Sequence, residues 1–545
     1  MPTAAGHDKV AGAINSTDQC SAACCAKGPS TLYKKDGCEA WWLDGNRNCY
    51  FCMGDKNNLT MLDGGKACEG TLATECATGL VTPPPPAPLP PAPLTGPLGG
   101  EGSAEYVDYG RLGRWPSHLN DTAFARSNMT AEGWPKADCS ICIFDLRPTG
   151  AWAPPMDDPE KRQPDLSGEW TMQITGQAAS ITFGDPSIKG ITIGESVYDA
   201  DTNIQTTPVT FATGKFPAVV NLVALKFEGT QATPVSPNNT GFTNLKFLAP
   251  GYKDKPEQLF TDNWAAVLKP FDHIRWMGAT GTNSYSWKCG GDNAAGCSVI
   301  EWADRNLPAY AFTDSKLCKG CLGTPWEHVL LAANELQSDV WINVPVTASA
   351  RTLCQSPVTD PKEGAKPGAN PHTCANPTQD PTQTYEYQLA LLFKNGNEYT
   401  NNTGLDSKLN VYIEHSNEVW NFGFPQYVLN KALAVWEVEN GTTAVPVGKS
   451  NLYSEVPGRP DINCTLKSAN QECWTHRRHA RRVYEIGKTF ESVFGAGSMN
   501  TRIRPVYASW TISIDEYYNN TLAWLAAEYG PVKVRMQVIR CGHHV

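Results

Sequence analysis

Apolar residues in this chain follow two spacings that predict different elements. Between about 165 and 250 they alternate with polar residues in short runs, as at Trp170, Met172 and Ile174, which predicts a block of strands resembling a small β-sandwich. Strands are also predicted at 105–112, 273–277, 340–344, 409–415, 502–508 and 532–539. Helices are predicted at 325–337, 384–394, 425–438, 475–494 and 514–529. This alternation of strands and helices predicts an α/β fold with the β block inserted.

The stretch Leu409–Asn421, L-N-V-Y-I-E-H-S-N-E-V-W-N, carries the first candidate for chemistry. Its apolar alternation stops after Ile413, so Glu418 is expected just beyond the carboxyl end of a buried strand. In folds of alternating strands and helices, that end presents catalytic side chains. Glu414 is one position out of phase with Ile413, is expected on the opposite side of the strand, and is the weaker candidate.

Proline and cysteine divide the chain into three parts. Residues 1–78 hold eight cysteines and form a small module that needs disulfides for stability. Residues 79–100 form a proline-rich linker of polyproline II type, which holds its neighbours apart. The remainder, 101–545, is the main domain.

Charge argues against some partners. The net charge is -10 and the pI about 5.6, which gives no electrostatic reason to expect nucleic-acid binding. The one basic run, His476–Arg482, is predicted to open a solvated helix face. No segment approaches the roughly 20 apolar residues that span a bilayer.

Cysteines and glycosylation sequons predict an extracellular or cell-wall location. Nineteen cysteines suit an oxidising compartment. The sequons begin at Asn15, Asn58, Asn120, Asn128, Asn238, Asn401, Asn440, Asn463 and Asn519. No signal peptide is visible at the N-terminus, which suggests that the true start is missing.

Loop disulfides are expected for Cys289–Cys297, Cys354–Cys374 and Cys464–Cys473. Zinc is the alternative for the Cys-x-x-Cys pairs that begin at Cys49, Cys139 and Cys318, and for Cys541 with His543 and His544. Disulfides are the better explanation in a sequon-rich chain, so no metal and no cofactor are predicted.

Two resemblances sharpen these expectations. The cysteine pattern of residues 1–78 resembles apple or PAN modules, which bind proteins and carbohydrates. An Asn-Glu pair after a predicted fourth strand resembles clan A glycoside hydrolases. The segments F-T-D-N-W-A-A-V-L-K-P-F-D-H-I-R-W-M-G, V-W-I-N-V-P and V-Y-I-E-H-S-N-E-V-W-N are similar to secreted barrel proteins described as cellulose-binding. The resemblance implies a TIM-type (β/α) barrel, incomplete at the C-terminus.

The same resemblance assigns roles to individual residues. It makes Glu418 the general acid/base, whose proton would go to the leaving glycosidic oxygen. The residues expected to bind substrate are Asn417, Arg275, Trp276, Asn343, Trp341, Trp420 and Tyr507. Each also has a simpler interpretation: Asn417 and Glu418 as a helix cap, Arg275 as an ion-pair member and each tryptophan as core.

The family's second carboxylate has no candidate here, because it follows a seventh strand and the chain ends after the predicted sixth. Two functions therefore stay open. One is a secreted glycoside hydrolase-like protein acting on cell-wall or matrix polysaccharide. The other is a non-catalytic carbohydrate-binding or matrix protein on a degenerate or truncated barrel. Polysaccharide or glycoprotein glycans are the expected partners of both.

Overall fold

The computed structural model describes part of the chain. The described residues are 7–9, 40–43, 49–52, 106–108, 111, 128–145, 166–183, 190–212, 222–285, 300–313, 323–349, 380–441, 445, 447–464, 471–509 and 514–530. They belong to two compact units, Met1–Pro91 and Ala92–Val545. The division between the units falls inside the proline-rich segment 79–100.

The first unit contains a small antiparallel sheet of three short strands. These are β1 (His7–Lys9), β2 (Ala40–Leu43) and β3 (Cys49–Cys52), in the spatial order β1-β3-β2. Most of the predicted cysteine-rich module, and all of the linker, lie outside the described residues.

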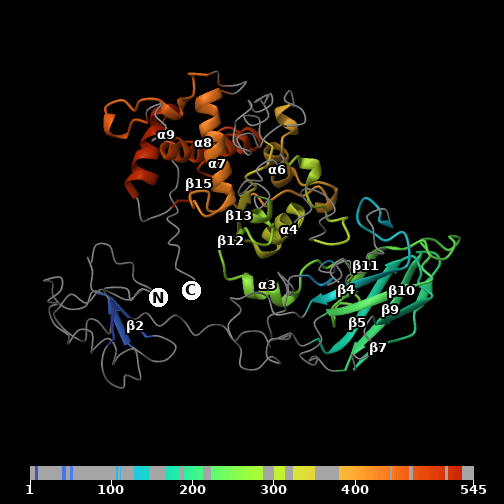
Figure 1. The fold of residues 1–545 in the computed structure, drawn as a ribbon. Coiled ribbons are helices and arrows are strands. Elements are labelled where there is room, and N and C mark those ends of the chain that lie inside the picture. The colour runs from blue at the N-terminus through green and yellow to red at the C-terminus, as the bar shows by residue number, and fades with distance from the viewer. Residues whose placement is uncertain are drawn as a thin grey trace. The chain divides into compact units, whose positions relative to one another are not determined.

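Two antiparallel sheets in the second unit share one hydrophobic core (Figure 1). The smaller sheet has the order β4 (Cys139–Asp145), β10 (Leu222–Glu228) and β6 (Ser180–Phe183). The larger has the order β11 (Thr243–Leu248), β5 (Gly168–Thr175), β9 (Ile204–Phe211) and β7 (Ile191–Ile193), and β8 (Val197–Asp199) also pairs with β9. The rings of Trp170 and Phe247 stack in this core with centroids 5.1 Å apart.

Strand β9 was not predicted, for a physical reason. Its inward positions include Gln205 and Thr207, which are 3% and 1% exposed, and Pro208 interrupts the run. The Gln205 side chain is paired inside the fold, because its Oε1 accepts a hydrogen bond from the Ala178 amide at 2.7 Å. Polar residues at core positions hide the alternation on which a strand prediction depends.

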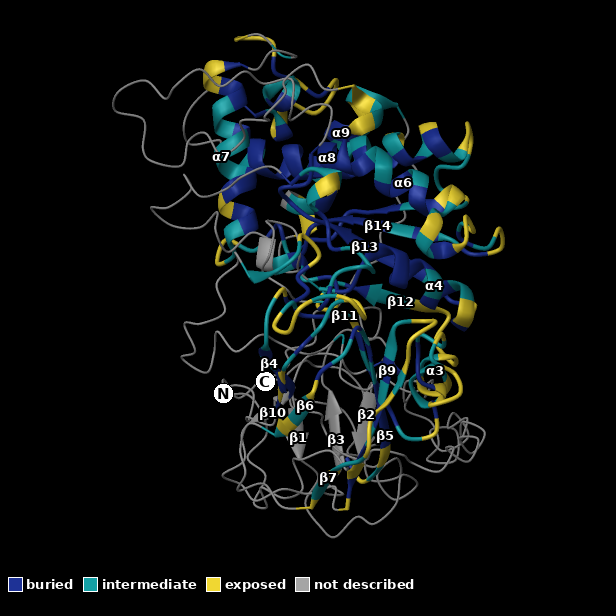
Figure 2. Cartoon of the chain, turned by 90° about the vertical axis from the view of Figure 1, so that its right-hand side faces the viewer, coloured by how far each residue is buried: buried dark blue, intermediate teal, exposed yellow. Residues whose placement is uncertain are grey.

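A parallel sheet and its helices make up the rest of the described second unit. The strands β12 (His273–Trp276), β13 (Asp339–Val344), β14 (Val411–His415) and β15 (Ile503–Val506) lie in chain order and match predicted strands. One face packs against α4 (Trp326–Leu336), α6 (Tyr385–Asn395) and α8 (Gln471–Phe494) in a single hydrophobic cluster. The remaining helices are α3 (Asp262–Leu268), α7 (Pro425–Asn440) and α9 (Thr521–Tyr529). Figure 2 shows β13, β14 and α8 as largely buried.

The predicted TIM-type barrel is wrong for the described chain. Its residues show a mixed α/β architecture in which the parallel sheet has four strands and two open edges, and no closed barrel is formed by them. The predicted first strand at 105–112 does not join this sheet. Instead, Tyr106 and Asp108 form antiparallel bridges with Phe260 and Leu248. The predicted strand at 532–539 lies outside the described residues.

The basic run on α8 is buried, so the predicted solvated face is also wrong. Arg477 is 2% exposed and donates to the carbonyls of Ser454 and Ile462 at 2.8 and 2.9 Å. Arg481 forms an ion pair with Glu437 of α7, and Arg482 forms one with Glu386 of α6. Carboxylates and carbonyls from distant segments therefore take the place of water around these cations.

One of the predicted disulfides, Cys464–Cys473, is present. The pairs Cys289–Cys297 and Cys354–Cys374 lie outside the described residues. Cys139 is a buried thiol whose pKa is raised by burial and by the neighbouring Asp138. Within the described ranges, no cluster of three or more histidine, cysteine or acidic side chains is arranged to hold a metal ion.

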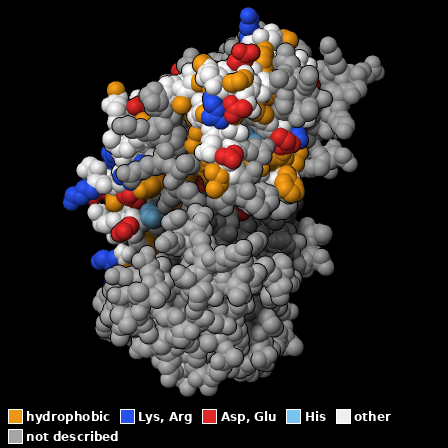
Figure 3. Space-filling view, turned by 90° about the vertical axis from the view of Figure 1, so that its left-hand side faces the viewer, with side chains coloured by type: hydrophobic (Ala, Val, Ile, Leu, Met, Phe, Trp, Pro, Cys, Tyr) orange, Lys and Arg blue, Asp and Glu red, His pale blue; other side chains and the backbone are white. Residues whose placement is uncertain are grey.

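The described surface carries charges of both signs. On the face drawn in Figure 3, acidic and basic side chains are interspersed with hydrophobic ones. Of the helices that the structure describes, none has the length and apolar character that a membrane crossing requires.

Candidate functional site at the carboxyl edge of the parallel sheet

Strand β14 delivers the candidate residues to the carboxyl edge of the sheet. Val411 and Ile413 point into the helix-covered core, so Tyr412 and Glu414 lie on the opposite face. Beyond the strand, Ser416 and Glu418 have φ values of +58° and +50°, which are rare for residues other than glycine. Such conformations are costly and concentrate at functional sites.

Glu414 is held by Arg275 of β12 across the intervening strand β13. The guanidinium donates from Nε to Oε2 at 3.0 Å and from Nη2 to Oε1 at 3.0 Å. The indole Nε1 of Trp341 adds a bond to Oε2 at 3.0 Å. Burial raises the pKa of the Glu414 carboxyl, while Arg275 opposes that change. The result is a bidentate, charge-assisted pair on the sheet face away from the helix-covered core.

Asn417 is fixed by the same arginine. Nη2 of Arg275 donates to its Oδ1 at 2.8 Å, and its Nδ2 donates to Oδ1 of Asn283 at 3.2 Å. Gln426 donates to the Asn417 carbonyl at 2.5 Å. Asn343, fully buried at the end of β13, donates to the carbonyl of Ser416, also at 2.5 Å. The structure therefore brings together three predicted residues, Arg275, Asn343 and Asn417.

Glu418 follows directly and is half-buried. Its Oε2 accepts a hydrogen bond from Nδ2 of Asn421 at 2.9 Å, and its carbonyl accepts one from the Asn421 amide at the same distance. Among the described residues it makes no ion pair. It does not cap α7, whose N-cap position is Phe424. The carboxylate is therefore positioned by a single amide and has oxygen lone pairs left for a ligand.

The aromatic residues predicted to bind substrate are buried in the described structure. Trp276 and Trp341 are each 4% exposed, Trp420 is 8% exposed and Tyr507 is 1% exposed. Trp276 packs in the hydrophobic cluster beneath the sheet, and the ring of Tyr507 lies 4.9 Å from that of His479. A side chain with so little accessible surface offers no ring face to a sugar. Trp341 serves instead as a hydrogen-bond donor to Glu414.

The residue that sequence reasoning undervalued is Glu414, together with its neighbours on the same sheet face. Tyr412 is half-buried, accepts a hydrogen bond from Nη1 of Arg504 at 2.7 Å, and has its ring 5.9 Å from that of the exposed His273. The alternation of side chains along each strand could have predicted this shared face. Positions that are out of phase with the core residues of neighbouring parallel strands line one common face.

Three other glutamates, Glu437, Glu472 and Glu485, have their partners outside this site. Glu437 and Glu485 pair with arginines of α8, and Glu472 bonds to Tyr427 and Lys431. Within the described network, Glu414 is the carboxylate that shares Arg275 with Asn417.

The chain matches no family model, no curated protein and no solved structure.

Proposed function

We propose that this protein is an extracellular or cell-wall glycoside hydrolase-like protein that acts on polysaccharide, with Glu418 as general acid/base. The observation that carries the proposal is the placement of the Glu418 carboxylate at the carboxyl edge of the sheet. Glu418 is half-buried and accepts a hydrogen bond from Asn421, and it forms no ion pair with any residue that the structure describes. It directly follows Asn417, which Arg275 holds by a hydrogen bond. The resemblance of this segment to clan A glycoside hydrolases supports the same role.

The chemistry requires two things of these residues. A protonated Glu418 gives its proton to the glycosidic oxygen as the bond to the leaving sugar breaks. Asn417, which is 3% exposed, holds the segment before Glu418 in place, because Arg275 and Asn283 fix its amide plane. The Arg275–Glu414 ion pair lies directly next to Asn417 and holds it in a fixed position.

A specific observation favours the second candidate, a non-catalytic glycan-binding protein. Glu414 shares Arg275 with Asn417, and its carboxylate oxygens accept hydrogen bonds from Arg275 and Trp341. A carboxylate held in this way is a poor nucleophile, and hydrolysis needs a second carboxylate to stabilise or attack the anomeric carbon.

An activity panel separates the two candidates. Purified protein would be tested on β-glucan, mannan, xylan and galactan for release of reducing ends, alongside Glu418→Gln and the exposed control Glu439→Gln on α7. We expect Glu418→Gln to lower the rate by about 10²- to 10⁴-fold and Glu439→Gln to leave it unchanged. Binding without turnover by all three proteins would favour the non-catalytic function, and neither binding nor turnover would contradict both.

The extracellular location is part of the proposal. The sequon asparagines Asn238, Asn401, Asn440 and Asn519 are exposed, so each is accessible to glycan addition. Expression through a eukaryotic secretory pathway, followed by removal of N-glycans, is expected to reduce the apparent mass. An unchanged mass would contradict the predicted location.

A further inference from the structure

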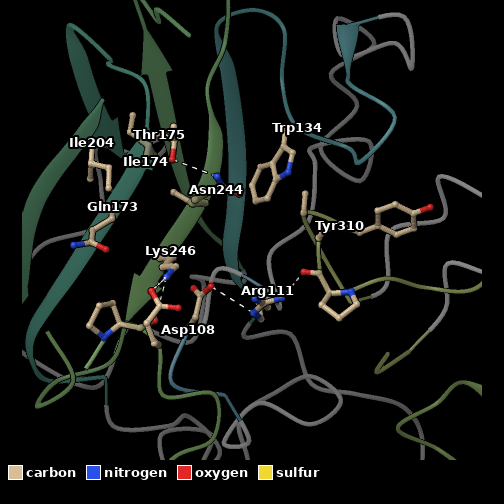
Figure 4. A pocket seen from close by; sticks show the side chains of 16 residues that line it. Asp108, Arg111, Trp134, Gln173, Ile174, Thr175, Ile204, Asn244, Lys246 and Tyr310 are labelled. Atoms are coloured by element: carbon tan, nitrogen blue, oxygen red, sulfur yellow. Dashed lines mark hydrogen bonds and ion pairs between the residues drawn. The ribbon is translucent and has the colours of Figure 1, made fainter. Parts of the chain in front are cut away.

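We propose that the β-sandwich carries a separate binding site for a neutral saccharide of one or two rings. The site is a cavity of about 470 Å³ beside strands β5 and β11 (Figure 4). It goes beyond the proposed function, because it lies on a different sheet from Glu418 and needs no hydrolysis. Its volume falls in the range of about 300 to 1,000 Å³ that small-molecule sites occupy.

The cavity is lined from both faces of the larger sheet, since core-facing Ile174 and Leu245 contribute to it beside outward-facing residues of the same strands. On β5, Met172 and Ile174 belong to the core, so Gln173 and Thr175 point outward. On the neighbouring strand β11, Asn244 and Lys246 point outward in the same way. Rigid strands therefore hold a row of polar side chains along one wall, and Trp134 forms part of the lining.

The charges in the lining are matched, which favours a neutral ligand. Nε of Arg111 lies 3.7 Å from Oδ2 of Asp108, and its Nη1 donates to the Pro308 carbonyl at 3.0 Å. Nζ of Lys246 lies 2.9 Å from Oε1 of Glu257. The two pairs bring the net charge of the lining to zero, so the lining offers no net attraction to an anion or a cation.

The remaining polar groups suit sugar hydroxyls. Gln173 and Asn244 each combine two N–H donors with a carbonyl acceptor, and Thr175 adds a hydroxyl. Nδ2 of Asn244 donates to Oγ1 of Thr175 at 3.3 Å, which leaves its second N–H and its oxygen for a ligand. Each hydroxyl of a saccharide both donates and accepts, so it pairs with such amides.

The backbone at Asn244 supplies an independent observation. Its φ is +50°, and the pairing of β11 with β5 shifts register between Thr243 and Lys246. A β-bulge of this kind re-aims a side chain, and asparagine adopts the left-handed conformation more readily than other non-glycine residues. Figure 4 shows the Asn244 amide directed toward Thr175 beside the cavity. The bulge is thus located at a residue whose side chain borders the proposed ligand.

The test uses the substitution Asn244→Gly, which removes the amide and suits the positive φ, so the fold is preserved. The matched control is Asn402→Gly, an exposed asparagine with φ of +52° in the loop before β14. Binding of cellobiose, laminaribiose, mannobiose and xylobiose would be measured by titration calorimetry. We expect at least one disaccharide to bind the full chain, with at least tenfold weaker binding to Asn244→Gly and unchanged binding to Asn402→Gly.

Several results would overturn the site. They are failure of all four disaccharides to bind, equal affinity of Asn244→Gly and the unaltered protein, or tighter binding of a uronic-acid disaccharide than of the neutral ones. The outcome is separable from the proposed function. Hydrolysis abolished by Glu418→Gln, with binding indifferent to Asn244→Gly, rejects this site alone. Binding sensitive to Asn244→Gly, without hydrolysis by the unaltered protein, rejects the catalytic role alone.

Discussion

Arg275 and Glu414 are separated by 139 positions in the sequence and form a bidentate ion pair across the parallel sheet. Arg275 lies on β12, Glu414 lies on β14, and Trp341 of the intervening strand bonds to the same carboxylate. The Glu414 side chain is 2% exposed and that of Arg275 is 28% exposed. The pair therefore links three strands directly beneath Asn417, and its loss should be felt in both stability and site geometry.

The first prediction concerns this pair. Arg275→Met should lower the free energy of unfolding by about 3–5 kcal/mol, because it leaves a buried carboxylate without its cationic partner. The double variant Arg275→Met/Glu414→Gln should lose less than the single variant, since it removes the uncompensated charge as well. Urea unfolding measures both values. An equal loss in both proteins would contradict the pairing. Arg459→Ala, which breaks the exposed pair with Asp461, is the control and should leave the free energy of unfolding nearly unchanged.

The second prediction is a pH dependence carried by buried histidines. Burial, with His476 and Arg478 nearby, lowers the pKa of His479 to about 3, and the pKa of His415 is also well below its usual value. In the unfolded chain each imidazole binds a proton near its usual pKa of 6.5. Between pH 6.5 and pH 3 the unfolded state holds more protons on His479, so stability falls as the pH falls, by about 1.4 kcal/mol per pH unit below pH 6 for this histidine. His415 contributes in the same direction.

Urea unfolding at pH 6 and pH 5 tests this dependence. His479→Gln should show a smaller loss between the two values than the unaltered protein, because one of the protonating groups is gone. The exposed His273→Gln serves as the control and should match the unaltered protein. A His479→Gln protein that loses as much as the unaltered one would show that His479 does not contribute.

The third prediction compares two glycines that have the same backbone angle. Gly241 and Gly448 both have φ of +77°. A Cβ at Gly241 would lie 1.9 Å from the Pro135 carbonyl oxygen, whereas one at Gly448 would have nothing within 4 Å. Gly448→Ala should cost about 1 kcal/mol from backbone strain alone, and Gly241→Ala should cost about 1–3 kcal/mol more because the strand connection must move. Equal thermal stability of the two variants would be the contrary result.

The fourth prediction concerns the Cys464–Cys473 disulfide. Cys473→Ala should lower the free energy of unfolding by roughly 2–4 kcal/mol, since the loop would be unconstrained in the unfolded chain. Cys464→Ala/Cys473→Ala should be no less stable than the single variant, because the bond is already absent. Thermal unfolding followed by circular dichroism provides the comparison, and additive losses would argue against the bond.

The spacing of apolar residues along the chain was sufficient to predict the strands and helices around the site. Val411 and Ile413 alternate with polar neighbours, and Trp326–Leu336 begins after a proline, so β14 and α4 were predicted within a residue or two. The same pattern was insufficient for β9, where Gln205 and Thr207 occupy inward positions because tertiary hydrogen bonds are available to them.

The sequence by itself determined that Glu414 and Ile413 would face opposite sides of a strand, because a strand's side chains alternate whatever surrounds it. It also placed Asn417 and Glu418 beyond the end of that strand. Only the tertiary structure decided that Arg275 would hold Glu414 and Asn417 together, and that the arginines of α8 would be buried against Glu437 and Glu386. The reason is physical: an ion pair depends on distances between segments that are far apart in the chain, and alternation along one segment carries no information about them.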